Sequence, residues 1–128
     1  RFNQLLIYSA RLQIAFNNSA TRFIESQSID EICPAGKNKK IATIVSNVFQ
    51  KYFLKEIQPY QANLAGYLET LLPLYNQLWF DQAITNKQIN TLIALDSQNN
   101  LLNQLKGSAK KHVTWWQNFY KTCEISPI

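Results

Sequence analysis

The sequence lacks methionine and is poor in cysteine, histidine, glycine and proline. Its 128 residues include two cysteines, one histidine, three glycines and four prolines. A single histidine excludes the two-histidine metal motifs, and the cysteines and the eight acidic residues show no spacing typical of a metal site. We therefore predict a non-enzymatic protein with no metal, no cofactor and no catalytic residue.

Long apolar runs are also missing. No run approaches the roughly 18 to 20 residues that cross a bilayer, and the chain opens at Arg1 without the pattern of a signal peptide. We interpret residues 1–128 as one domain, a processed or excised fragment. It contains no membrane span, and the sequence leaves open whether a longer parent protein has membrane helices on either side of it.

Charge is scarce as well. Only 16% of the residues are charged, compared with about 25% in a typical protein. The net charge of +5 favours acidic partners, but it is not the dense basic face of a dedicated nucleic-acid binder. We expect the partner to be another protein, possibly acidic, and not nucleic acid; the oligomeric state is left open.

What the sequence does have is apolar residues at helical spacing almost throughout, without sustained period-two alternation. The pattern predicts an all-α, antiparallel helical bundle. For the first helix, residues 2–27, we predict a core-facing stripe. Its members are Phe2, Leu5, Leu12, Phe16, Ala20 and Phe23. The last helix is predicted to bury Trp116, Phe119, Tyr120 and Cys123.

The number of helices depends on Pro59, Pro73 and Gly107. A proline inside a helix kinks it or ends it, and Gly107 either ends one helix before Ser108 caps the next or only loosens a single helix. These choices give three to five helices, with kinks at Pro59 and Pro73. A capping box at Thr85 and Gln88 predicts that a helix begins there and continues through the polar residues 96–100.

The two cysteines report on the topology. With an odd number of antiparallel helices, the loop that holds Cys33 and the end of the last helix, which holds Cys123, lie at the same end of the bundle. We predict a Cys33–Cys123 disulfide, and hence an extracytoplasmic location, either periplasmic or secreted. The alternative is two reduced cysteines in a cytosolic protein.

Two groups of residues are candidate binding sites for a partner or an anion. Basic residues crowd the predicted start of the second helix. If Ser108 caps the last helix, basic residues also crowd its start, and His112 beside them is expected to be exposed. Trp115 lies toward the edge of the core stripe of the last helix, where it is either a partner anchor or a partly buried core residue. The candidate residues are Lys37, Lys39, Lys40, Lys110, Lys111, Trp115 and Lys121.

These observations leave three functions open. The first is a non-enzymatic extracytoplasmic domain that mediates protein–protein interaction, such as an adaptor, an inhibitor or an immunity-type factor. The second is the periplasmic ligand-sensing domain of a membrane receptor, with a small ligand in the bundle core. The third is a small enzyme that uses Cys33 or His112, for which a pocket containing this histidine and a thiolate is required.

Overall fold

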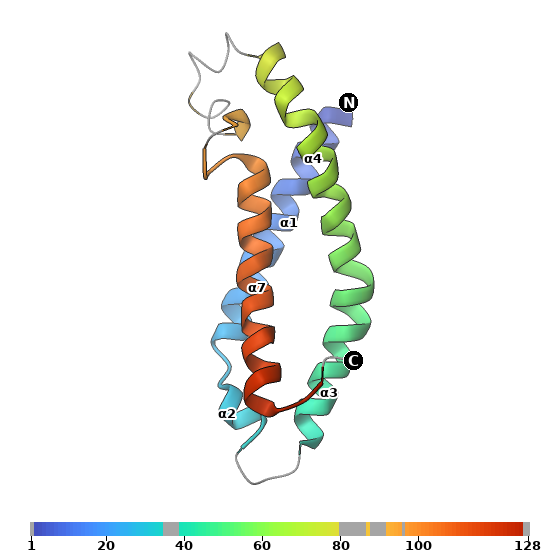
Figure 1. The fold of residues 1–128 in the computed structure, drawn as a ribbon, viewed down its shortest axis with the longest axis vertical. Coiled ribbons are helices and arrows are strands. Elements are labelled where there is room, and N and C mark those ends of the chain that lie inside the picture. Colours follow the sequence, from blue (N-terminus) through green and yellow to red (C-terminus); the bar gives the residue numbers. More distant parts are fainter. Residues whose placement is uncertain (1, 35–38, 80–86, 88–91, 96, 127–128) are drawn as a thin grey trace.

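The protein is an all-α, antiparallel bundle, as the sequence predicts (Figure 1). The computed structural model describes residues 2–34, 39–79, 87, 92–95 and 97–126. These residues include three long helical rods and a four-residue helix, and Lys87, Leu92 and Ile93 are also helical. The first rod is α1 (Phe2–Glu25), which is followed by the short α2 (Ile29–Ile32). The second rod combines α3 (Lys40–Val48), η1 (Phe49–Ile57) and α4 (Gln58–Leu78), and the third is α7 (Leu101–Cys123).

The second rod runs through both of its prolines without a break. The segment η1 is a π-helix that ends just before Pro59, and the N–H of Gln58 donates to the carbonyl of Phe53, five residues back. A wider turn relieves the clash between a proline ring and the carbonyl four residues before it. Pro73 lies inside α4. Figure 1 shows the rod bowed away from α7 along its middle.

The last helix begins at Leu101, between the two starts that the sequence leaves open, Thr85 and Ser108. The helix expected from Thr85 onward does not continue through residues 96–100, because the chain from Ala94 to Asn100 is not helical where it is described. The side chain of Asn100 instead accepts a hydrogen bond from the N–H of Asn103 at 2.8 Å and caps α7. Thr85 and Gln88 themselves lie outside the described residues.

Gly107 does not end a helix, and Ser108 is not a cap. The helix α7 continues through both residues, and Ser108 is buried. The predicted cluster of positive charge at a helix start, formed by Lys110, Lys111 and His112, is therefore wrong, because these residues lie in the middle of α7.

The substitution Gly107→Ala tests this continuity. No atom lies within 4 Å of a methyl group added at Gly107, so alanine fits and lowers the entropy of the unfolded chain. We expect the free energy of unfolding to rise by about 0.5–1 kcal/mol, measured in urea. A decrease would contradict a continuous helix, because alanine is strained in a left-handed C-cap.

Cys33 and Cys123 are joined by a disulfide, with Cα atoms 5.7 Å apart. Three antiparallel rods bring the loop after α2 to the end of α7, as the argument from an odd number of helices requires. At this end, the ammonium group of Lys39 donates to the carbonyl oxygen of Glu124 at 3.2 Å. The disulfide thus ties the first connection of the bundle to the end of α7.

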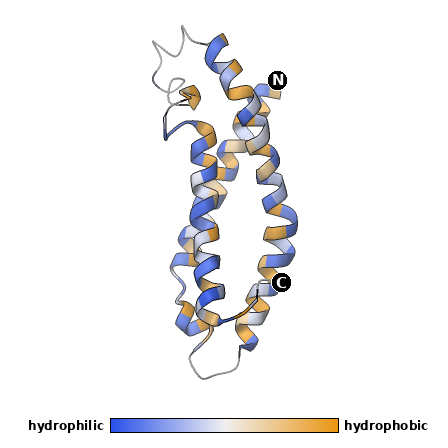
Figure 2. Ribbon diagram, in the orientation of Figure 1, coloured by the Kyte–Doolittle hydropathy of each residue, from blue (hydrophilic) through white to orange (hydrophobic). Residues whose placement is uncertain are grey.

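The core is divided into an aromatic part near the disulfide and an aliphatic part further along the rods. The aromatic part contains Phe49, Phe53, Trp116, Phe119, Tyr120 and Cys123, which confirms the stripe predicted for the last helix. The aliphatic part contains Leu6, Ala10, Leu64, Leu68, Leu101 and Leu105. Hydrophobic residues recur along every rod in Figure 2, on outer as well as inner faces.

The stripe predicted to bury α1 is wrong. Its five large members, Phe2, Leu5, Leu12, Phe16 and Phe23, are 52% to 69% exposed. The helix instead buries Leu6, Ala10, Gln13, Asn17 and Thr21. The physical reason lies in the neighbouring helices, because the buried amide groups of α1 find hydrogen-bond partners on α4 and α7. The second rod likewise exposes Ile41, Ile44, Val48 and Tyr52.

Candidate functional site

A layer of polar side chains lies between the two parts of the core, and Asn17 is its centre. Gln13 donates to the Oδ1 of Asn17 at 2.8 Å, and the Nδ2 of Asn17 donates to the Oε1 of Gln61 at 2.6 Å and to the Oγ of Ser108 at 3.0 Å. All four residues are at least nine-tenths buried. The layer therefore links α1, α4 and α7 through hydrogen bonds whose loss leaves buried polar atoms unpaired.

His112 lies one helical turn beyond Ser108 and is only 7% exposed, so the expectation of an exposed histidine is wrong. Its ring packs 4.7 Å from that of Phe53, and its Nε2 accepts a hydrogen bond from the indole N–H of Trp116 at 3.4 Å. Its Nδ1 has no hydrogen-bond partner within the described parts of the chain. Burial lowers the pKa of His112 below its ordinary value of 6.5.

This burial predicts a loss of stability in mild acid. The unfolded chain takes up the proton near pH 6.5, while the folded chain resists it until the lower pKa of buried His112 is reached. The contribution of His112 to stability is therefore complete above about pH 6.5 and falls as the pH decreases from there toward the folded-state pKa. Urea melts at about pH 7.5 and about pH 5 measure the free energy of unfolding. Between these two values it should fall less in His112→Phe, which keeps an aromatic ring but cannot take up a proton, than in wild type. Equal falls in both proteins would contradict the prediction.

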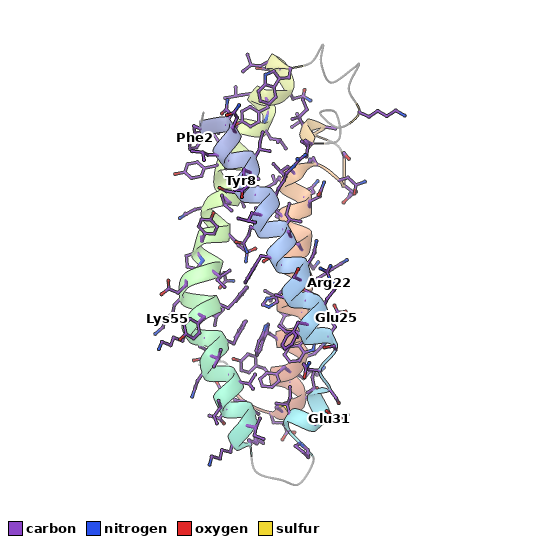
Figure 3. All side chains as sticks on the ribbon, turned by 180° about the vertical axis from the view of Figure 1, so that it is seen from behind. Phe2, Tyr8, Arg22, Glu25, Glu31 and Lys55 are labelled. Carbon is purple, nitrogen blue, oxygen red and sulfur yellow. A yellow bond between two sulfur atoms is a disulfide. The ribbon has the colours of Figure 1, made fainter. Side chains whose placement is uncertain are left out.

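Large apolar side chains are exposed along one face of α1, and they meet exposed apolar residues of α4 at Phe2. Five of the six large members on α1 are the residues predicted for the core, and Tyr8, 64% exposed, is the sixth. Phe2 packs edge-on against Tyr67 of α4 at 5.6 Å between ring centroids, which joins the two helices. Tyr60, Leu74 and Leu78 follow the helical spacing of Tyr67 and are also exposed. Figure 3 shows α1, with Phe2 and Tyr8 labelled, in front of the other helices. We call these ten residues the docking face.

The size of the docking face sets it apart from ordinary surface. Four of the six members on α1 are aromatic, with about 150–250 Å² each, and two are smaller leucines. Because all six are more than half exposed, together they present on the order of 600 Å². The largest apolar patch on a typical monomer is about 300–600 Å². The six members of α1 alone therefore reach the upper end of that range, and the residues of α4 that they meet at Phe2 add to them.

A groove lies on another side of the molecule, between the second rod and α7. Its volume is about 400 Å³, and its walls are formed by apolar residues and alanines with polar residues among them. Gln61 of the polar layer and Phe53 of the aromatic core both line it. Lys106 of α7 and Glu69 of α4 form an ion pair at 2.8 Å. The lining residues are Phe53, Gln58, Gln61, Ala62, Ala65, Leu105, Lys106, Ala109, Lys110, Val113, Thr114 and Gln117.

The lysines and the tryptophan singled out from the sequence do not form one site. Lys39 pairs with Glu124 at 3.9 Å near the disulfide, whereas Lys110 lies 13 residues before Cys123, about 20 Å along α7. Trp115 is half-buried, stacked on Phe119 with ring centroids 5.6 Å apart. Lys40, Lys111 and Lys121 are exposed, and Lys37 lies outside the described residues.

A small enzyme that uses Cys33 or His112 requires a pocket that holds this histidine beside a thiolate, and this structure does not form one from Cys33 and His112. The sulfur of Cys33 is bonded to that of Cys123, and His112 packs among aromatic rings. Among the residues that the structure describes, no group of three histidine, cysteine or acidic side chains is placed to hold a metal ion. None of the described helices is both long enough and apolar enough to cross a membrane.

The fold and its surfaces define a disulfide-linked, three-rod helical domain with a large apolar face. The model of one family, described as a protein of unknown function, DUF3080, matches residues 1–127, and the chain belongs to this family. Comparisons with curated proteins and with solved structures found no match.

Proposed function

We propose that this chain is a non-enzymatic, extracytoplasmic binding domain whose docking face receives a helix of another protein. The observation that carries the proposal is the exposure of six large apolar side chains on one face of α1. A helix normally turns such a stripe toward a core. Here the bundle already uses a different side of α1, with both apolar and polar residues, for its own packing.

The charge beside the docking face supports an acidic partner. Arg11 and Arg22 are exposed on α1 and lie off the apolar stripe by helical spacing. Because an apolar centre with a charged rim is the usual composition of an interface, the partner helix is expected to carry apolar residues at helical spacing with acidic residues beside them.

The disulfide supports the extracytoplasmic part of the proposal. Disulfides persist in oxidising compartments and are rare in the cytosol, and Cys33 and Cys123 form one here. Extracytoplasmic adaptors, inhibitors and immunity-type factors are each compatible with such a binding face.

Site-specific photo-crosslinking tests the proposal. A benzoylphenylalanine residue replaces Leu5 of the docking face in one protein and its exposed neighbour Gln4, off the stripe, in the matched control. In the source cell, position 5 should give a discrete protein adduct that position 4 does not give. The purified partner should then bind wild type at least about tenfold more tightly than Leu12→Gln, as expected for an interface anchor.

The result also separates the proposal from other uses of an apolar face. An adduct with a second copy of this chain would make the docking face a dimer interface, and lipid adducts without protein would indicate a membrane surface. Equal adducts at positions 4 and 5 would contradict the docking face.

A further inference from the structure

We infer that the groove between the second rod and α7 binds a small, chain-like carboxylate, such as a fatty acid anion. This inference does not rest on the docking face, which lies elsewhere on the molecule. It assigns a ligand class to the groove from its size, its lining and its charge.

The size of the groove favours a small molecule. Ligand pockets typically have volumes of about 300–1,000 Å³, and the groove has about 400 Å³. One turn of a helix, about 10 Å across and 5.4 Å long, already has a volume similar to that of the groove. The groove is therefore large enough for an alkyl chain but too small for a stable helical segment.

The lining favours an alkyl chain. Ala62 and Ala65 of α4 face the groove together with Ala109 of α7. These small side chains leave space between two helices that larger residues would close. Val113 and Gln117 also line a second hollow of about 340 Å³ beside Trp116, so the apolar slot extends along α7 toward the aromatic core.

The charge favours a single negative group. Lys106 and Lys110 are one turn apart on α7, and like charges at this spacing repel each other. Glu69 neutralises Lys106; two lysines against one glutamate leave one positive charge. Gln58 and Gln117 also line the groove and carry amide N–H groups that can donate to a carboxylate.

An occupant of the groove would also touch the interior of the bundle. Gln61 accepts from Asn17, and Phe53 stacks on Phe49 at 5.0 Å and packs against His112. A ligand that displaces Gln61 changes a contact between the second rod and α1, and one that displaces Phe53 changes a contact between the second rod and α7. The groove is thus placed to alter the packing of the helices when it is filled.

Calorimetric titration of the purified, disulfide-intact chain with decanoate tests the inference. We expect saturable binding of one decanoate per chain. Ala62→Trp, at an exposed position on the wall of the groove, should weaken it at least about tenfold by filling the slot. Ala109→Leu is the second filling variant, on the opposite helix, and helical circular dichroism verifies that both fold.

The charge is tested with a matched pair. Lys110→Gln should weaken decanoate binding roughly tenfold, the effect of one charge-assisted contact, and leave the binding of uncharged 1-decanol unchanged. Lys111→Gln, the neighbouring lysine that does not line the groove, should bind decanoate like wild type. No saturable binding, undiminished binding in both folded filling variants, or equal losses in the two lysine variants would overturn the inference. Crosslinking at the docking face is unaffected by any of these outcomes.

Discussion

Removing the Cys33–Cys123 disulfide is expected to lower the free energy of unfolding by about 2–5 kcal/mol. The bond joins residues 90 apart in sequence, so the unfolded chain loses much conformational freedom when it is linked. The exposed Lys39–Glu124 pair at the same end contributes little by comparison. Denaturant melts with and without reductant measure the difference.

The double variant Cys33→Ser/Cys123→Ser is the control. It should match reduced wild type and show no response to reductant. Intact mass after alkylation, with and without prior reduction, checks the bond itself. Two freely alkylated thiols in native material would contradict both the disulfide and the extracytoplasmic location inferred from it.

Replacing Asn17 by alanine is the second change with a large expected effect. The variant leaves Gln13 and Gln61 buried without their partner, and each stranded polar group costs about 1–3 kcal/mol. We expect a total loss of about 2–4 kcal/mol in urea melts. Asn18→Ala, next in the sequence and outside this hydrogen-bond network, should change stability by less than about 0.5 kcal/mol. Similar losses in the two variants would mean that the polar layer does not hold the rods together.

Helical spacing was sufficient to predict the fold class and the buried face of the last helix. In α7 one stripe is both apolar and aromatic, with Trp116, Phe119 and Cys123 at helical spacing, so the pattern has one solution. The chain has two cysteines, and both lie near helix ends. An odd number of antiparallel rods brings these ends together, and this was likewise enough to predict the disulfide.

The face of α1 could not be predicted in this way. This helix carries a strongly apolar stripe through Phe16 and a second, mixed stripe through Leu6 and Asn17, and periodicity favours the more apolar one. The choice depends on Gln61 and Ser108, which are far away in the sequence and supply partners for Asn17. A line of amide and hydroxyl residues at helical spacing was the available signal.

The groove and the burial of His112 were missed for a related reason. Both depend on whether Gly107 ends a helix, because the phase of α7 decides which side Ser108 and His112 occupy. Local sequence around Gly107 and Ser108 fits a helix end and a cap as well as a helix interior. Packing against α1 and the second rod makes the choice.

The claim that α1 turns its apolar stripe away from the core is tested most directly by the unfolding free energy of Phe16→Ala. Phe16 is 52% exposed, and we expect the variant to unfold within about 0.5 kcal/mol of wild type, like other surface substitutions. A loss of about 3–5 kcal/mol, the cost of emptying a core phenylalanine site, would contradict this orientation of α1 and the docking face built on it.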